Sequence, residues 1–243
     1  MDLSVVMPAW NEIEYIESSL EGLSRALADV KGASAEIIVV DDGSTDGTRE
    51  SAKRWIEEHR HINARLIETE HVGKGNALRV GTAAASGDHI AWTDSDGECD
   101  FDAIPRMYGA LLARPDASCA VANVDTSRRG NPALRKIYYA VLEKLWGQKL
   151  PCLLSGCRMF HKSRTPDISS KGFMVELEVT RQHAMMGPIL WIDSELHQRA
   201  HGGKKLDGPV MIKFCRDAAA FMARELARAP RKIIKKKQNK INQ

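Results

Sequence analysis

The chain lacks several features that would place it in a membrane, a secretory pathway or a disulfide-rich class. No apolar run approaches the roughly 18–20 residues that a membrane-spanning helix needs. The opening MDLSVVMP has no basic segment ahead of its short apolar stretch, so we expect no signal peptide. The five cysteines are an odd number without CxxC spacing, which argues against a disulfide framework and a structural zinc site. We therefore expect a reducing compartment.

Common nucleotide-binding and metal-binding signatures are also missing. No GxGxxG follows the first apolar run, and Gly73-Lys74-Gly75 does not match GxxxxGK[ST]. The eight histidines show no HExxH spacing. Neither a Rossmann dinucleotide site nor a Walker-type site is expected.

Basic charge is concentrated at one end of the chain. The net charge is +3, yet residues 231–243 (RKIIKKKQNKINQ) hold six Lys or Arg and no acid, which leaves residues 1–230 with a charge of −3. A mildly acidic body argues against a dedicated nucleic-acid binder, and we expect no nucleic-acid partner. A polybasic segment is attracted to anionic lipid, so we expect a peripheral protein on the cytoplasmic face of a membrane.

Short β-rich runs alternate with amphipathic stretches over the first 125 residues. Strands are expected at 3–7, 36–40, 64–68, 89–93 and 118–123, and helices at 13–27, 46–59, 74–85 and 102–113. This alternation predicts an α/β fold with a mainly parallel central sheet and helices on both faces.

The remainder of the chain is less regular. We expect helices at 133–146, 172–186 and 210–228, and strands at 158–161 and 188–192. Residues 1–209 are predicted to form a single domain whose halves are 1–125 and 126–209. Residues 210–243 would add a C-terminal amphipathic helix and the basic tail.

Polar, acidic or Gly-rich segments follow each of the first four predicted strands. They are Pro8–Glu12, Asp41–Thr48, His71–Asn76 and Asp94–Glu98. Any one of them could be a plain turn, because Asp, Gly, Ser and Asn favour turns. Since ligand sites lie at the carboxyl ends of parallel strands, the four together predict one binding site.

Three acids alternate directly after the fourth predicted strand. If the chain stays extended, the side chains of Asp94, Asp96 and Glu98 point to one side. Three carboxylates suit Mg²⁺ or Mn²⁺, and such a cation can neutralise a departing diphosphate. The alternative is a strand-end turn with solvated acids. Asp41 and Asp42, after the second strand, could accept hydrogen bonds from a base or a ribose.

Four segments carry a family resemblance. They are VVMPAWNE (5–12), IIVVDDGSTDGT (37–48), GKGNALRVGTAAASGDHI (73–90) and TDSDGE (93–98). Together they resemble the family 2 glycosyltransferases with a GT-A type fold. Within that family, SGCRMF (155–160) and RAHGGKK (199–205) look most like the polyprenyl-phosphate (dolichyl-phosphate) hexose synthases. The QxxRW segment of processive synthases does not occur, so a polymerising role is not expected.

The resemblance implies a metal-dependent inverting enzyme that moves one hexose, of mannose or glucose type, from a nucleotide diphosphate sugar to a polyprenyl phosphate. The catalytic residues would be Asp94, Asp96, Arg135 and Arg199. Donor contacts would come from Pro8, Asn11, Glu12, Asp41, Asp42, Lys74, Asp94, Ser95 and Lys205. Acceptor contacts would come from Arg128, Arg129, Arg135, Ser155 and Arg158. A divalent metal, Mg²⁺ or Mn²⁺, would be held by Asp94, Asp96 and Glu98.

Three alternatives stay open. Cys152 stands where the group usually has Asp, and Lys204 where it has Ser, which leaves room for a glycan or lipid-sugar hydroxyl as acceptor. A hydroxyl needs a general base, for which Glu176 and Glu178 are candidates. Asp94-Ser95-Asp96-Gly97 also imitates the nucleophile segment of haloacid-dehalogenase-type phosphatases. The last alternative is a non-catalytic sugar-nucleotide-binding module.

Overall fold

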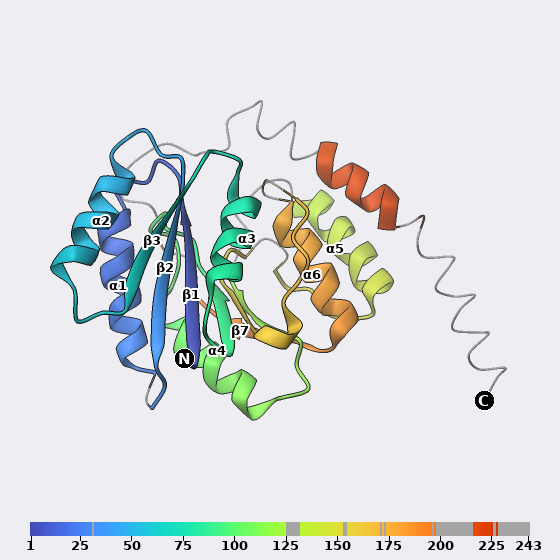
Figure 1. The fold of residues 1–243 in the computed structure, drawn as a ribbon. Helices are drawn as coiled ribbons and strands as arrows, with labels where there is room; N and C mark the ends of the chain where they lie inside the picture. Colours follow the sequence, from blue (N-terminus) through green and yellow to red (C-terminus); the bar gives the residue numbers. More distant parts are fainter. Residues whose placement is uncertain are drawn as a thin grey trace. The chain divides into compact units, whose positions relative to one another are not determined.

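The computed structural model describes residues 1–30, 32–124, 132–152, 155–170, 172, 174–195, 197, 216–225 and 227 (Figure 1). The chain divides into two compact units. The first comprises Met1–Arg129 and Pro151–Gly202, and the second comprises Gly130–Leu150 and Gly203–Gln243. The division at residue 209 that the sequence suggested stays a prediction.

Within the described residues of the first unit, seven strands form one sheet in the order β3-β2-β1-β4-β6-β5-β7. They are β1 (Leu3–Ala9), β2 (Ala35–Asp42), β3 (Ala64–Thr69), β4 (His89–Trp92), β5 (Cys119–Asn123), β6 (Arg158–His161) and β7 (Ile189–Asp193). β6 pairs antiparallel with β4 and β5, and the other pairings are parallel. The segment that precedes β6 therefore reaches the edge at which the parallel strands end.

One face of the sheet packs against α1 (Ile16–Ala28), α2 (Thr48–Glu58) and α4 (Ala103–Ala113). Side chains alternate between the faces of a strand, so Val5 and Met7 of β1 point to this side. They join a buried cluster with Leu20 of α1, Trp55 of α2 and Met107 of α4. This layer forms a continuous hydrophobic core.

The other face carries α3 (Lys74–Ala84) and α6 (Val175–Met186). Gly81 lets α3 approach closely, because a Cβ there would lie 2.3 Å from Val6 Cγ1 and 2.9 Å from Val40 Cγ2. On α6, the His183 ring packs at a centroid distance of 5.3 Å from Phe160 of β6. The predicted α/β fold, with a mainly parallel sheet between helices, is confirmed (Figure 1).

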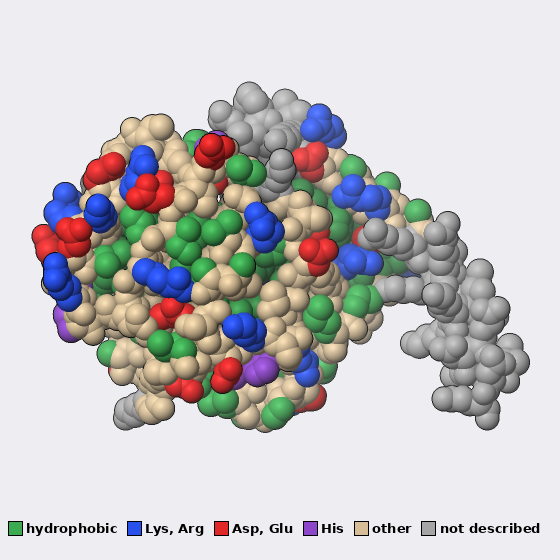
Figure 2. Space-filling view, in the orientation of Figure 1, with side chains coloured by type: hydrophobic (Ala, Val, Ile, Leu, Met, Phe, Trp, Pro, Cys, Tyr) green, Lys and Arg blue, Asp and Glu red, His purple; other side chains and the backbone are tan. Residues whose placement is uncertain are grey.

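The surface of the first unit mixes both signs of charge. On the face shown in Figure 2, Lys and Arg side chains alternate with Asp and Glu over the region of α1 and α2. Arg54 of α2 and Glu17 of α1 form one such pair, with Nη2 and Oε1 2.7 Å apart and both side chains at least half exposed. An exposed pair of this kind contributes little to stability.

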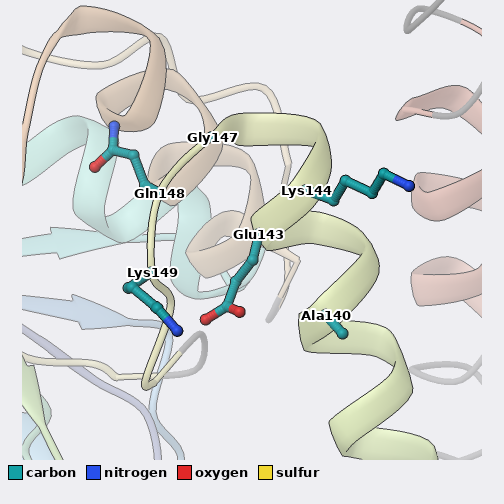
Figure 3. Close-up of a pocket in the computed structure, with 6 residues that line it drawn as sticks. All are labelled: Ala140, Glu143, Lys144, Gly147, Gln148 and Lys149. Carbon is teal, nitrogen blue, oxygen red and sulfur yellow. The ribbon is translucent and has the colours of Figure 1, made fainter.

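The second unit contains α5 (Pro132–Trp146) and a helical segment at 216–225, which lies in the predicted amphipathic helix. Trp146 Nε1 donates to Glu225 Oε2 at 2.9 Å, and its ring packs edge-on against Phe221. A hollow of about 410 Å³ is lined by Ala140, Glu143, Lys144, Gly147, Gln148 and Lys149 (Figure 3). The basic tail, 231–243, lies outside the described residues. Among those described, no helix combines the length and apolar character needed to cross a membrane.

Candidate active site

The loop after β1 and the loop after β2 are joined by hydrogen bonds. The Asn11 amide donates to Ser44 Oγ at 3.0 Å, and Asn11 Oδ1 accepts from the Thr45 amide at 2.9 Å. The Glu12 amide donates to Thr48 Oγ1 at 2.8 Å. Asn11 has a φ of 53°, in the left-handed region that Asn tolerates better than most residues. Asn11 and Glu12, predicted as donor contacts, thus also fix the shape of this edge.

The acids at the end of β2 are both buried but differ in their hydrogen bonding. Asp42 accepts from the amides of Val72, at 3.0 Å, and Gly73, at 2.9 Å, so its carboxylate holds the loop before α3. Asp41 Oδ2 accepts from the Ser44 amide at 3.2 Å. Within the described part of the chain, Asp41 Oδ1 is buried and has no hydrogen-bond partner. A buried acceptor without a donor is costly, which makes this oxygen a good candidate to bind a ligand.

An aromatic pair extends this edge. The rings of Trp10 and His71 are stacked, with centroids 4.4 Å apart and an interplanar angle of 18°. Trp10 is 42% exposed. Trp10 is not among the site residues predicted from the sequence, although an aromatic residue directly after a strand that ends at a site was an available signal.

The acidic turn after β4 differs from its prediction. The Glu98 amide donates to Asp96 Oδ1 at 3.1 Å, and Gly97 has a φ of +75°. The chain therefore turns instead of staying extended, so the alternation from which a common direction of Asp94, Asp96 and Glu98 was inferred does not apply. No group of three acid, His or Cys side chains suited to a metal occurs among the described residues. All three acids remain partly exposed at this edge.

Two other predicted donor contacts have internal roles. Ser95 is 3% exposed, and its Oγ donates to the Pro8 carbonyl at 2.9 Å. The Ser95 carbonyl accepts from Ser19 Oγ at 3.1 Å. Ser95 and Pro8 thus join the ends of β4 and β1 to α1, and their side chains lie beneath the site surface.

Lys74, at the start of α3, lies between two carboxylates. Its Nζ is 2.7 Å from Asp94 Oδ1 and 2.9 Å from Glu176 Oε1 of α6. Burial lowers the pKa of Lys74, but Asp94 and Glu176 raise it by more, so the net pKa lies above its ordinary value. The side chain is therefore a permanent cation at physiological pH.

Arg158, at the start of β6, is fully buried. Its Nη2 is 2.7 Å from Glu176 Oε2, and its Nη1 donates to Thr180 Oγ1 at 3.2 Å. A guanidinium with no exposed surface cannot contact an acceptor in this arrangement, so the predicted acceptor contact at Arg158 needs correction. Arg158 does pair with a negative group, but the partner is the Glu176 carboxylate, 18 residues away along the chain, and not an acceptor phosphate.

The two candidate bases hold structure in the same region. Glu176 is 4% exposed and pairs with both Lys74 and Arg158. Glu178 accepts from the Ser170 amide at 2.9 Å and from the Ser169 hydroxyl. Both carboxylates are therefore already used as acceptors, which disfavours either as a general base.

The structure describes only some of the remaining predicted residues. Ser155 is 3% exposed, and its Oγ interacts with the backbone of Cys157. Arg135 lies on α5 in the second unit, and its side chain is not among those described. Four other predicted residues lie outside the described part of the chain: Arg128, Arg129, Arg199 and Lys205. Their roles stay predictions.

The fold and the acidic turn define a protein of GT-A type, and solved structures agree. Glucosyl-3-phosphoglycerate synthase from Mycobacterium tuberculosis in complex with UDP superposes with a TM-score of 0.68 and 26% identity over 92% of this chain and 79% of that one. The same synthase with Mn²⁺, UDP-glucose and phosphoglyceric acid has a TM-score of 0.62 and 25% identity, over 83% and 72% of the two chains.

Residues 4–167 match the Glycosyl transferase family 2 model, and the chain belongs to this family. Dolichyl-phosphate beta-glucosyltransferase of Drosophila melanogaster is 34% identical over 116 residues, which cover 46% of this chain and 36% of that protein. The Homo sapiens enzyme of the same name is 31% identical over 114 residues, or 45% and 35%. The chain thus spans about a third of the length of these curated relatives. Family membership argues against the phosphatase alternative.

Proposed function

We propose that the chain transfers one hexose, with inversion, from a nucleotide diphosphate sugar to a polyprenyl phosphate, and that the transfer depends on a divalent cation. The observation that carries the proposal is the acidic turn at the carboxyl end of β4. It lies at the same edge of the sheet as Asp41, whose Oδ1 is buried without a partner among the described residues.

The donor nucleoside would bind along the ends of β1 and β2. A flat, partly exposed Trp10 ring offers a stacking surface to a base, and Asp41 Oδ1 can accept from a ribose hydroxyl or a base N–H. The Mycobacterium tuberculosis synthase was solved with UDP and with UDP-glucose, which supports a nucleotide diphosphate sugar as donor. The names of the curated relatives favour glucose over mannose.

The cation would lie at the acidic turn. Asp96 and Glu98 offer carboxylate oxygens, the ligands that Mg²⁺ and Mn²⁺ prefer, so the chemistry of the donor set fits. With no third protein ligand gathered there among the described residues, oxygens of the diphosphate would complete the shell. When bound, the cation would stabilise the negative charge of the departing diphosphate.

The acceptor is proposed to be a phosphate because it needs no general base. A phosphate monoester is ionised at neutral pH, whereas a hydroxyl must lose a proton to a nearby carboxylate. Glu176 and Glu178 are both engaged by neighbouring groups. The relatives named for dolichyl phosphate support the same choice. We further propose that the basic segment 231–243 attracts the protein to the anionic membrane that contains such a lipid.

A thermal-shift series tests the donor, followed by a transfer assay for the acceptor. UDP- and GDP-sugars are compared with and without Mn²⁺, and the correct donor should raise the melting temperature most, because only the folded state binds it.

Transfer is then measured to a short-chain polyprenyl phosphate and to the matching polyprenol. If no nucleotide sugar raises the melting temperature, the proposal is wrong. If the hexose is transferred only to the polyprenol, the acceptor group is a hydroxyl and not a phosphate. Stabilisation without any turnover would leave a sugar-nucleotide-binding module.

Gly156 provides a test of the position of Asp94. A Cβ at Gly156 would lie 1.9 Å from Asp94 Oδ2, so Gly156→Ala must displace that carboxylate. Small displacements of an active-site group can cost about 100-fold in rate, and we expect a loss of that order in kcat/KM for transfer. Gly109→Ala is the matched control, since a Cβ at Gly109 in α4 meets nothing within 4 Å. Equal activity of the two variants would show that transfer does not depend on the position of the Asp94 carboxylate.

A further inference from the structure

Four charged side chains form a continuous series at the edge of the site. In order they are Asp94, Lys74, Glu176 and Arg158, with neighbouring charged atoms 2.7 Å, 2.9 Å and 2.7 Å apart. They come from the loop after β4, from α3, from α6 and from β6. The charges alternate in sign and sum to zero, so the series needs no further ion to be neutral.

Exposure increases steadily along this series from Arg158 to Asp94. The side chain of Arg158 is fully buried and that of Glu176 is 5% exposed, whereas Lys74 is 17% and Asp94 29% exposed. The inner pair is fixed by burial and by the bond from Arg158 to Thr180. If Lys74 moved away, the buried Glu176 carboxylate would lose one of its two cationic partners among the described residues, which would cost free energy. Its ammonium group is therefore held in place beside Asp94.

Both oxygens of Asp94 are confined in this arrangement. Oδ1 contacts Lys74 Nζ, and Oδ2 lies over Gly156. A divalent cation that approaches Asp94 meets a fixed positive charge at the same carboxylate, and like charges in a partly buried site repel strongly. A nucleotide diphosphate brings negative charge that both cations can share.

We propose that Lys74 is a resident counter-cation of the donor site: held by Glu176 and Arg158, it neutralises Asp94 in the empty site and keeps the affinity for a free divalent cation low until a nucleotide diphosphate binds. This rests on the proposed metal-dependent transfer. It makes Lys74 a residue that sets the order of binding. Glu176 and Arg158 act through Lys74 as positioning residues.

The test measures Mn²⁺ binding to the full chain by calorimetry, first with Mn²⁺ alone and then with UDP or GDP present. Lys74→Met should bind Mn²⁺ alone about tenfold more tightly than the wild type, because the competing charge is gone. The gain in Mn²⁺ affinity on adding the nucleotide should shrink accordingly. Lys53→Met, an exposed lysine on α2, is the control and should match the wild type.

Glu176→Gln gives a second test, with the opposite sign. Among the described residues it leaves Asp94 as the remaining carboxylate partner of Lys74 and removes the carboxylate that pairs with Arg158, so Mn²⁺ alone should bind about tenfold more weakly. A purely structural role would weaken Mn²⁺ binding in both variants. This variant also serves if Lys74→Met fails to fold, which thermal melting would show.

The outcomes separate the two proposals. Unchanged or weaker binding of Mn²⁺ alone by folded Lys74→Met, or tighter binding by Glu176→Gln, overturns the role of Lys74 while metal-dependent transfer stands. If the wild type binds no Mn²⁺ even with UDP or GDP present, the metal-dependent mechanism fails, and this inference fails with it.

Discussion

Asp96→Ala is expected to lower kcat/KM for hexose transfer by about 1,000-fold. Asp96 is partly exposed in the turn after β4, where the proposed cation and diphosphate meet. A bound cation supplies several kcal/mol of stabilisation to a developing negative charge, and each 1.36 kcal/mol corresponds to a factor of ten in rate. The measurement is steady-state transfer to a short-chain polyprenyl phosphate over a range of Mn²⁺ concentrations.

Two further variants separate the chemistry of Asp96 from its role in the turn. In Asp96→Asn, the side-chain amide would still offer an oxygen to the Glu98 amide, which Asp96 Oδ1 accepts at 3.1 Å. This variant should therefore keep its melting temperature and still lose most of its activity. Asp88→Asn removes an exposed acid just before β4, at the opposite edge of the sheet, and should leave transfer unchanged. Near wild-type transfer by Asp96→Asn would show that the negative charge of Asp96 is not needed, because an Asn side-chain oxygen can still bind a cation.

Most of the fold could be predicted from local patterns. A buried parallel strand is apolar on both faces, so EIIVV at 36–40 indicated a strand and the structure extends it to Ala35–Asp42. Arg158–His161 was predicted with the bounds that it has. The antiparallel direction of β6 could not be predicted in this way, because direction depends on pairing with β4 and β5, which are far away in the sequence.

The structure brings the segments selected from the sequence to one edge of the sheet, but side-chain directions did not follow from the pattern. The strand-end rule that selected the turn after β4 depends only on backbone topology, and the parallel pairing of β1, β2 and β4 agrees with it. The direction of each acid depends on turn geometry, and Gly97 at φ +75° changes it. The tests of Asp96 and Gly156 are needed for this reason.

Arg158→Met is expected to cost about 3 kcal/mol of the free energy of unfolding. The change removes one partner of a buried ion pair and, among the described residues, leaves Lys74 as the remaining cation beside Glu176. Breaking a buried pair in this way typically costs about 3–5 kcal/mol, and the remaining contact to Lys74 favours the lower end. Urea denaturation of the wild type and the variant measures the difference.

The matched control is Arg54→Met on α2. Arg54 and Glu17 are also 2.7 Å apart, but their side chains are 59% and 50% exposed, so the loss should stay below about 1 kcal/mol. Distance is thus held constant while burial changes, and the comparison isolates the cost of an uncompensated buried charge. Similar losses in the two variants would mean that water reaches Glu176 in solution. In that case the buried anchor that holds Lys74 beside Asp94 would not exist, and Glu176 would again be available as a general base.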